Sequence, residues 1–459
     1  MTHSDPVIML VAGEPSGDDR GAGLARALRA RLGSRLRLVG VGGPRMAEAG
    51  VDSLFDMSEI SVFGLLEGLL AIPRVRRRAE ETARAVVREG ADLVVLIDSW
   101  GFSWLAARAI RRLAPKVRLV KYVAPQVWAT RPGRAKALAG LVDHLLVINS
   151  FEPPYFEAWG LPTTFVGNPA LHMDFSSCVP AAFRARHGIG AQAPVLLVLP
   201  GSRPGEVDRL LGPFEDAIRR LKADHPGLQV VLPVADAVAD RVRAAVAGWP
   251  FRVHVVDGEQ EKREAMKASD LALACSGTVT LEVAQAGVPM VVAYRLGAVT
   301  YFVAKFLIRT PWVVLFNIAA RRFVAPELIQ EDCTGPRLAA QLDRRLRDPA
   351  FRRAQVAAQD AALDKMGRGG PDPSETAARI VLGLLSEDQP PAADLYRRAG
   401  ARLRAARQAR LIFVQQAQNN PRGGLRGIGA AASHLVQRRV LSRNLRAPQV
   451  RVPKSPIKL

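Results

Sequence analysis

The chain of 459 residues has few cysteines, few histidines and few aromatic residues. Its three cysteines, Cys178, Cys275 and Cys333, are odd in number and far apart, which excludes a disulfide framework and indicates a reducing compartment. No two cysteines have the spacing of zinc ligands, and the seven histidines form no HExxH or HxxxH pair. We therefore expect no metal site.

Long hydrophobic runs are also missing. The longest candidate, residues 298–320, is interrupted by Lys305, Arg309 and Pro311, and no run reaches the roughly 18 apolar residues of a membrane-spanning helix. The apolar run Val7–Ala12 lacks the basic residues that precede the core of a signal peptide. We expect a protein that is soluble or peripheral to a membrane.

Acidic residues are scarce toward the C-terminus. The whole chain carries a formal charge of +21, of which residues 391–459 contribute +14, with Asp394 as their only acid. This basic tail has one apolar cluster, residues 411–414, which is too little for a core. We expect a flexible tail that lies on an anionic membrane surface. Nucleic acid is the less favoured partner because Tyr396 and Phe413 are the tail's only aromatic residues.

Short apolar strands that alternate with helical patterns are abundant, and apolar residues make up 49% of the chain. Strand patterns fall at residues 7–12, 37–41, 92–97, 117–123, 145–148 and 164–166, and then at 195–199, 229–232, 253–256, 271–274 and 289–293. This alternation predicts α/β domains with parallel sheets covered on both faces. The predicted units are two Rossmann-like domains that face each other across a cleft (1–175 and 190–345), closing helices (346–388) and the tail (389–459).

The clearest motif of the second half follows the strand at 195–199. Gly201, Ser202 and Arg203 form a turn that opens a helix. Free N–H groups at a helix N-terminus bind anions, and the Arg203 guanidinium can add a bidentate contact to phosphate. The alternative is a plain turn in which Ser202 caps the helix.

A second turn of this kind contains Ser276, Gly277 and Thr278. Both turns follow strands of one domain, where α/β sheets bind ligands. Glu282 lies one helical turn beyond Thr278 and can accept hydrogen bonds from a ribose. Its alternative role is that of a first-turn acid favoured by the helix dipole.

Two motifs of the first half also follow strands. The turn at residues 12–18, which includes Ser16, Gly17 and Asp18, lacks GxGxxG spacing, so we expect no dinucleotide cofactor; a tight turn capped by Ser16 is favoured. Asp98 ends an apolar strand at the mouth of the cleft. Its carboxylate is a candidate general base, with helix capping as the alternative.

Residues 62–72 are unusually apolar and contain Phe63, Leu66 and Leu69, and Arg74 opens the run of arginines that follows. An apolar stretch rimmed by arginine suggests a membrane-surface or acyl-chain site. The alternative is a core helix followed by a solvated turn.

In their order and spacing, these segments resemble lipid-A-disaccharide synthases, inverting glycosyltransferases with a GT-B fold. The resemblance runs from about Ile8 to Thr334 and rests on residues 11–18, 40–46, 61–67, 97–98, 122–128, 199–203, 276–282 and 326–334. It implies transfer from UDP-2,3-diacylglucosamine to 2,3-diacylglucosamine 1-phosphate, which yields a β-1,6-linked disaccharide and UDP. It also implies a cytoplasmic enzyme, peripheral on the inner membrane, that uses no cofactor.

The resemblance also implies roles for single residues. Asp98 matches the expected base and Arg203 the essential arginine. The expected nucleotide-sugar side comprises Gly201, Ser202, Ser276, Gly277, Thr278, Glu282 and Asn317. The expected acceptor and membrane side comprises Ser16, Gly17, Asp18, Phe63, Leu66, Leu69 and Arg74. The resemblance leaves open whether the chain forms a homodimer.

The chain departs from the family pattern around the acceptor. The usual Ile-Asp-x-Pro-Asp-Phe-Asn reads Ile-Asp-Ser-Trp-Gly-Phe-Ser at residues 97–103, and Gly-His-Pro reads Gly-Asn-Pro at 167–169. The nucleotide-side blocks are intact. Two alternatives are therefore a paralogue with another acylated acceptor and a catalytically silent protein that binds UDP-sugar or membrane. A UDP-sugar 2-epimerase is a third, but a soluble sugar needs no apolar patch.

Overall fold

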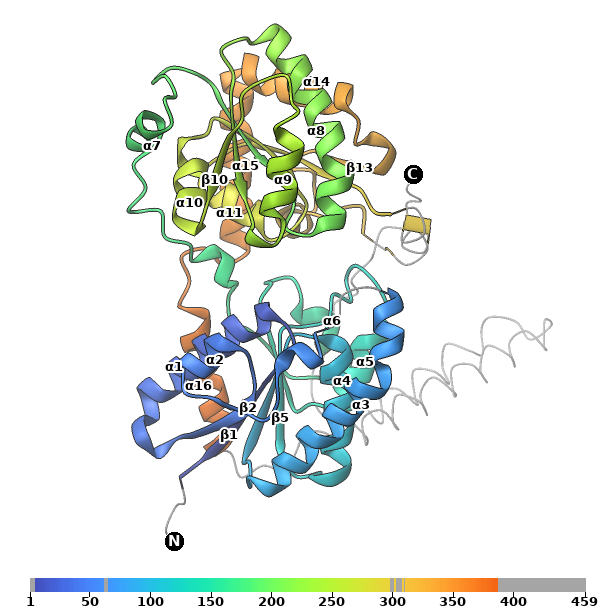
Figure 1. The fold of residues 1–459 in the computed structure, drawn as a ribbon. Helices are drawn as coiled ribbons and strands as arrows, with labels where there is room; N and C mark the ends of the chain where they lie inside the picture. Colours follow the sequence, from blue (N-terminus) through green and yellow to red (C-terminus); the bar gives the residue numbers. More distant parts are fainter. Residues whose placement is uncertain (1–4, 62–64, 298–300, 303–307, 309, 387–459) are drawn as a thin grey trace, which may run out of the picture.

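The computed structural model describes residues 5–61, 65–297, 301–302, 308 and 310–386, and for residues 65–69 it describes the backbone alone. The chain forms two stacked lobes, each built on one parallel sheet (Figure 1). Two segments connect the lobes, one near residue 170 and one that leads into the last described helix (Figure 1). This arrangement confirms the predicted GT-B-like fold.

The first lobe holds a seven-stranded sheet in the order β3-β2-β1-β4-β5-β6-β7. Its strands are β1 Val7–Ala12, β2 Arg37–Val41, β3 Asp52–Ser53, β4 Leu93–Ile97, β5 Arg118–Tyr122, β6 His144–Val147 and β7 Thr163–Phe165. Its helices are α1 Pro15–Leu32, α2 Pro44–Glu48, α3 Leu65–Arg88, α4 Trp100–Leu113, α5 Gly133–Ala139 and α6 Pro153–Glu157. Every residue of β4 is buried, as expected for a central parallel strand with helices on both faces.

The second lobe holds a six-stranded sheet in the order β10-β9-β8-β11-β12-β13. Its strands are β8 Val195–Leu199, β9 Gln229–Val234, β10 His254–Asp257, β11 Leu271–Cys275, β12 Met290–Tyr294 and β13 Glu327–Ile329. The helices from residue 180 onward are α7 Pro180–Arg186, α8 Pro204–Asp224, α9 Ala239–Val246, α10 Glu259–Ala268, α11 Val279–Gln285, α13 Leu315–Ala320, α14 Gly335–Arg347, α15 Pro349–Lys365 and α16 Pro373–Ser386.

Both sheets reverse their strand order at one point, between β1 and β4 in the first and between β8 and β11 in the second. Ligands of open α/β sheets bind at such switch points, beyond the carboxyl ends of the strands. The four turns that leave these four strands contain Glu14, Asp98, Arg203 and Ser276. The topology thus selects the same turns that the sequence motifs selected.

The last three helices divide between the lobes. Ala362 and Leu363 of α15 lie in the core of the second lobe. Ala377 and Val381 of α16 lie instead in the core of the first lobe, where α16 packs against α1 (Figure 1). The closing helices predicted at 346–388 therefore pack on two different cores.

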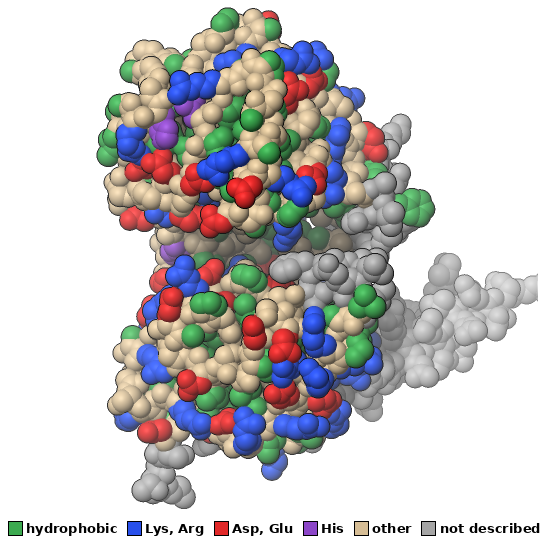
Figure 2. Space-filling model, viewed as in Figure 1, with side chains coloured by type: hydrophobic (Ala, Val, Ile, Leu, Met, Phe, Trp, Pro, Cys, Tyr) green, Lys and Arg blue, Asp and Glu red, His purple; other side chains and the backbone are tan. Residues whose placement is uncertain are grey.

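No helix among the described residues combines the length and the apolar character needed to cross a membrane. The predicted tail, 389–459, lies outside the described residues. In the space-filling view the two lobes meet at a narrow waist, and basic side chains gather beside apolar ones over α3 (Figure 2).

Candidate active site

Asp98 is held in an ion pair at the end of β4. Its backbone is in the left-handed region, with φ of 51°. Its carboxylate Oδ2 accepts a hydrogen bond from the Ser16 hydroxyl at 2.9 Å and pairs with the Arg20 guanidinium at 2.8 Å. The other oxygen, Oδ1, accepts one longer bond from the Ser99 amide at 3.2 Å. Oδ1 is therefore the atom of this carboxylate with most capacity to accept a proton.

Sequence reasoning missed Arg20. The available signal was its place four residues after Ser16, which puts both side chains on one face of α1. Arg20 also donates to the Ser16 carbonyl at 2.9 Å, so it joins the turn after β1 to the turn after β4. The predicted cap role of Ser16 is wrong, because α1 begins at Pro15 with Glu14 in the N-cap position and no side-chain cap.

Glu14 is a second carboxylate at the same switch point. Burial, and after it the charge of Asp98, raise the pKa of Glu14 above its ordinary value. The charges of Lys121 and Arg203 and a hydrogen bond with Ser99 act in the opposite direction. Arg203 belongs to the second lobe, so the charges that act on Glu14 come from both lobes.

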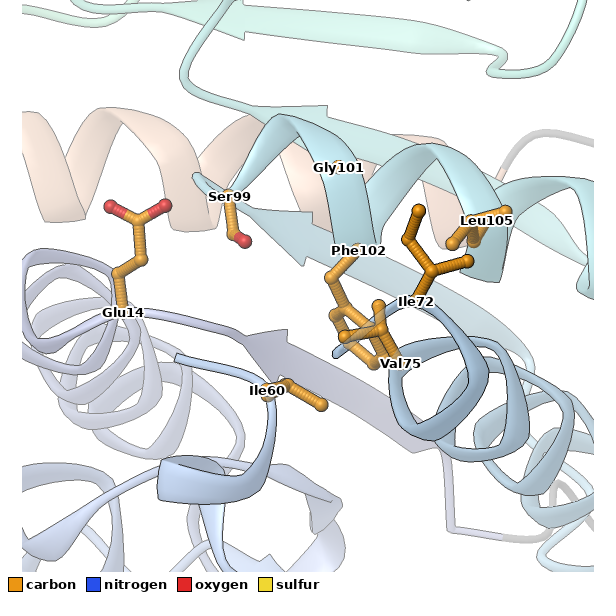
Figure 3. Close-up of a pocket in the computed structure, with 8 residues that line it drawn as sticks. All are labelled: Glu14, Ile60, Ile72, Val75, Ser99, Gly101, Phe102 and Leu105. Atoms are coloured by element: carbon orange, nitrogen blue, oxygen red, sulfur yellow. The ribbon is translucent and has the colours of Figure 1, made fainter. Parts of the chain in front are cut away.

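A cavity of about 290 Å³ is lined by Glu14 and by Ser99, the residue that follows Asp98. Figure 3 shows Glu14 and Ser99 at one end and the apolar side chains gathered at the other. The apolar part is lined by Ile60, Ile72, Val75, Phe102 and Leu105. A Cβ at Gly101, which also lines the cavity, would meet nothing within 4 Å, so the cavity has room at this position. One polar end and one apolar end suit an amphiphilic ligand.

Asp18 and Gly17 serve the fold around the site. The buried Asp18 carboxylate accepts hydrogen bonds from the amides of Gly43, Arg45 and Met46 at 2.8–3.0 Å, and so caps the start of α2. Its predicted place on the acceptor side stays a prediction, and it would involve a carboxylate that already accepts three amides. Gly17 is buried, and a Cβ there would lie 3.3 Å from that of Ala12, so the close approach of α1 to the end of β1 favours glycine.

The part of the predicted apolar, arginine-rimmed segment that the structure describes, from Leu65 onward, forms the start of α3. Phe63 lies outside the described residues, as do the side chains of Leu66 and Leu69. Leu70 is 78% exposed, and Arg74 is exposed one turn further along. The described part therefore presents an apolar side chain beside basic ones to solvent.

The turn after β8 is open and needs glycine. Gly201 has φ of 113°, and a Cβ there would lie 2.8 Å from the buried Glu206 side chain. Arg203 occupies the N-cap position of the 21-residue helix α8, which has no side-chain cap, so the alternative with Ser202 as cap is wrong. The Arg203 side chain is 70% exposed, with a contact to Glu206 at 3.3 Å. It is thus available to an anion in the cleft.

The turn after β11 is similar. Gly277 and Thr278 are exposed, and Ser276 is partly exposed. Glu282 in α11 is paired with Lys262 of α10 at 2.8 Å, and Lys262 was not found from the sequence. A ribose contact by Glu282 stays a prediction, and it would involve a carboxylate that already has a cationic partner.

Asn317 is fully buried in α13. Its Oδ1 accepts from the amides of Val324 and Ala325, and its Nδ2 donates to the Ala325 carbonyl and to Glu327, all at 2.8–3.1 Å. These bonds give Asn317 a structural role in holding residues 324–327. Its predicted place on the nucleotide side stays a prediction.

The sequence matches the family model for Lipid-A-disaccharide synthetase over residues 8–381. The lipid-A-disaccharide synthase of Rhodospirillum centenum is 44% identical over 381 residues, which cover 83% of this chain and 95% of the relative. The chain belongs to the lipid-A-disaccharide synthase family. A second member, from Paramagnetospirillum magneticum, is 42% identical and covers 83% of this chain and 98% of the relative. The prediction of a hexosyltransferase of this family is confirmed.

Solved structures support the fold of this family member. The UDP-GlcNAc 2-epimerase of Neisseria meningitidis, bound to UDP-GlcNAc, has a TM-score of 0.56, with 83% of this chain and 99% of that chain covered. Its sequence identity is 11%, so the likeness concerns the fold alone. Kinship at over 40% identity with the synthases argues against the epimerase alternative.

Proposed function

We propose that the chain transfers 2,3-diacylglucosamine from its UDP derivative to 2,3-diacylglucosamine 1-phosphate with inversion, forming the β-1,6 disaccharide and UDP. The observation that carries the proposal is the cavity that Glu14 and Ser99 line at one end, next to Asp98 in the chain, and that apolar side chains line at the other end. A lipid acceptor needs both an apolar wall and a base near its hydroxyl, and the first lobe offers the two together.

Asp98 is the proposed general base. An inverting displacement needs one group to take the proton of the acceptor hydroxyl while the diphosphate leaves. Ser16 and Arg20 orient the carboxylate through Oδ2, which leaves Oδ1 to receive that proton. Glu14, whose pKa is raised and which lines the cavity, is the second carboxylate at this switch point.

The second lobe is proposed to hold the UDP diphosphate. Arg203 can form a charge-assisted contact with it, and the main-chain N–H groups at the start of α8 face the same switch point. Positive charge placed where the leaving diphosphate gains negative charge stabilises the transition state. Because the chain supplies this charge, the proposed mechanism requires no metal.

The proposed place of action is the cytoplasmic face of the inner membrane, where the enzyme is peripheral. The start of α3 joins an exposed Leu70 to Arg74, Arg76 and Arg77, and Ile72 and Val75 of the same helix line the cavity. An acyl chain leaving the bilayer at α3 would thus reach the pocket along one helix. Basic side chains beside it would contact anionic headgroups.

The test is incubation of the full chain with UDP-2,3-diacylglucosamine and 2,3-diacylglucosamine 1-phosphate, followed by mass analysis of the lipids. We expect a disaccharide 1-phosphate and one UDP per linkage formed, with a β-1,6 linkage by NMR. UDP-GlcNAc, which lacks the acyl chains, is the matched control donor and should give little product. Product only with a different acylated acceptor would contradict the proposed acceptor and support the divergent paralogue.

A further inference from the structure

A lysine is buried inside the first sheet, directly beneath the candidate active site. Lys121 belongs to β5, is paired in register with Leu96 of β4, and is 1% exposed. An ammonium in such a place is costly unless its hydrogens are bonded, so it needs a structural or chemical reason. Neither the sequence motifs nor the proposed mechanism uses it.

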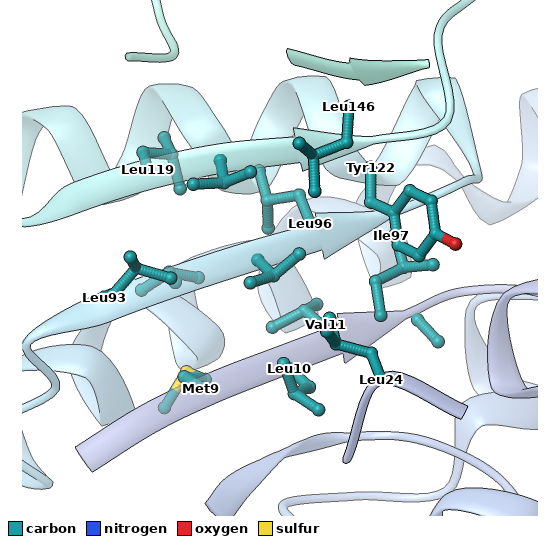
Figure 4. Close-up of a cluster of buried hydrophobic side chains, with 14 of the residues drawn as sticks. Met9, Leu10, Val11, Leu24, Leu93, Leu96, Ile97, Leu119, Tyr122 and Leu146 are labelled. Carbon is teal, nitrogen blue, oxygen red and sulfur yellow. The ribbon is translucent and has the colours of Figure 1, made fainter. Parts of the chain in front are cut away.

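The ammonium of Lys121 donates hydrogen bonds to three backbone carbonyls at the ends of β4 and β5. It donates to the carbonyl of Leu96 at 3.3 Å, to that of Tyr122 at 3.2 Å, and to that of Asp98. Figure 4 shows Leu96, Ile97 and Tyr122 at this end of the two strands. The Tyr122 carbonyl also accepts the Asp98 amide at 2.9 Å, so one cluster joins both strand ends.

The backbone at these strand ends is strained. Asp98, Ser99 and Val123 have φ of 51°, 37° and 71°, a region that non-glycine residues rarely adopt. Such conformations cost energy and persist only where the surroundings enforce them. The bonds from Lys121 reach the carbonyl of Asp98 itself, and the Ser103 hydroxyl adds a second bond to that oxygen at 2.7 Å.

We propose that Lys121 is a positioning residue: its ammonium holds the left-handed turn at Asp98–Ser99 and thereby aims the Asp98 carboxylate at Ser16 and Arg20. The expected effect of Lys121 on turnover rests on the proposed function. Lys121 itself touches backbone carbonyls in this structure and acts on the reaction through Asp98.

The charge of Lys121 also belongs to the site. The charged groups that act on it are Asp98 after β4, Glu14 after β1, and Arg20 of α1. Burial lowers the pKa of Lys121 to about 7, against the attraction of the two carboxylates. A neutral amine has two hydrogens for three carbonyls, so the turn should loosen as the pH rises through 7. An arginine at this position would keep its charge throughout that range.

The experiment compares Lys121→Met and Lys121→Arg with the wild type in the full chain. Lys116→Met, which removes an exposed lysine just before β5, is the control. We expect Lys121→Met to lower kcat about 10- to 100-fold, because a small misplacement of a reacting group has effects of this size. KM for the UDP donor and UDP affinity should stay within about twofold, since both depend on the other lobe.

The pH profile separates positioning from general structure. We expect kcat of the wild type to fall as the pH rises through about 7, and Lys121→Arg to keep substantial activity without that fall. Wild-type kcat and an unchanged profile in Lys121→Met would overturn the inference. So would equal losses of kcat and UDP affinity together with a lower unfolding temperature, because they indicate a general structural role.

A crystal structure of Lys121→Met, or of Lys121→Arg if the first does not fold, gives a readout without activity. We expect Asp98 and Ser99 to leave the left-handed region in Lys121→Met and to stay in it in Lys121→Arg. An unchanged turn in Lys121→Met, or a relaxed one in Lys121→Arg, would overturn the inference. Absence of disaccharide product with the wild type would instead contradict the proposed function, and the structures would still decide the role of Lys121.

Discussion

The two switch points differ in how far their charges are already paired. In the first lobe Asp98 has Arg20 and Ser16 as partners, and Lys121 is buried among carbonyls. In the second lobe Arg203 is 70% exposed, and the turn at residues 276–278 is exposed or partly exposed to solvent. The charged groups of the first lobe are therefore already paired, whereas Arg203 in the second lobe stays largely solvated and can pair with a charged ligand.

This difference fits the division of chemical work. A base must be held in one direction before the substrate arrives, because misdirection lowers the rate directly. A diphosphate brings its own charge, so a solvated arginine and free N–H groups can bind it without being paired beforehand. Variants in the first half should therefore affect turnover, and variants in the second half affinity.

The largest expected effect is that of Asp98→Asn. Loss of the base should lower turnover by about 10²–10⁴ and leave UDP affinity unchanged. Steady-state kinetics and calorimetry with UDP measure the two quantities. The control is Asp19→Asn, which alters an exposed carboxylate of the same helix region. Near-normal turnover of Asp98→Asn would remove Asp98 from the mechanism and favour Glu14 as the base.

Arg203→Ala tests the second half. Loss of a charge-assisted contact should weaken UDP binding by about 1.5–3 kcal/mol, measured by calorimetry. Arg241→Ala removes another exposed arginine of the same lobe, paired with Asp208 on the outside of α8, and should leave UDP affinity unchanged. Unchanged affinity in Arg203→Ala would contradict the predicted contact. Arg203 would then act only by stabilising the transition state or by stabilising the fold.

Asp18→Ala tests whether Asp18 stabilises the fold of the first lobe or takes part in acceptor binding. It removes the carboxylate that accepts three amides at the start of α2. The free energy of unfolding should fall by about 1–3 kcal/mol in a urea titration, since buried donors lose their partner. KM for the acceptor should change less than twofold in the protein that remains folded. A large rise of that KM at unchanged stability would support the predicted acceptor role instead.

Glu152 provides a pH test of the first lobe. It is buried, accepts bonds from Trp128 and from the Asn149 amide, and burial raises its pKa to about 7. The folded state thus binds more protons than the unfolded state between about pH 4.5 and 7. Stability present below this window is lost as the pH rises through 7.

Denaturant titrations at several pH values measure this contribution. From pH 5 to 8, the wild type should lose about 1–3 kcal/mol of unfolding free energy relative to Glu152→Gln, which does not titrate. Parallel pH dependence in the two proteins would show that Glu152 titrates normally.

The smallest effect on catalysis is expected from truncation after Ser386, the last residue of α16. The remaining chain should fold and bind UDP within about twofold of the full chain, because both cores are complete. Its co-sedimentation with anionic vesicles should weaken and lose most of its salt dependence, since the removed residues carry +14. Equal sedimentation of both forms would show that the tail is no membrane tether.

Strands, motif turns and family membership could all be predicted from local sequence. The bounds of β1, β2 and β8 agree with the predicted runs, because a strand buried on both faces must be continuously apolar. The glycine turns could also be recognised, because a positive φ such as that of Gly201 is a property of a few residues close in sequence. Such features need no knowledge of distant residues.

Only the tertiary structure decided which partner each charge takes. Arg20 and Asp98 are 78 positions apart, and Lys121 meets the Asp98 carbonyl only because β4 and β5 are neighbours in register. The tertiary structure likewise decided that Asp18 accepts hydrogen bonds from the start of α2 and that α16 packs on the core of the first lobe. Pairing depends on strand order and on helix packing over long sequence separations, and hydrophobic periodicity carries no information about either.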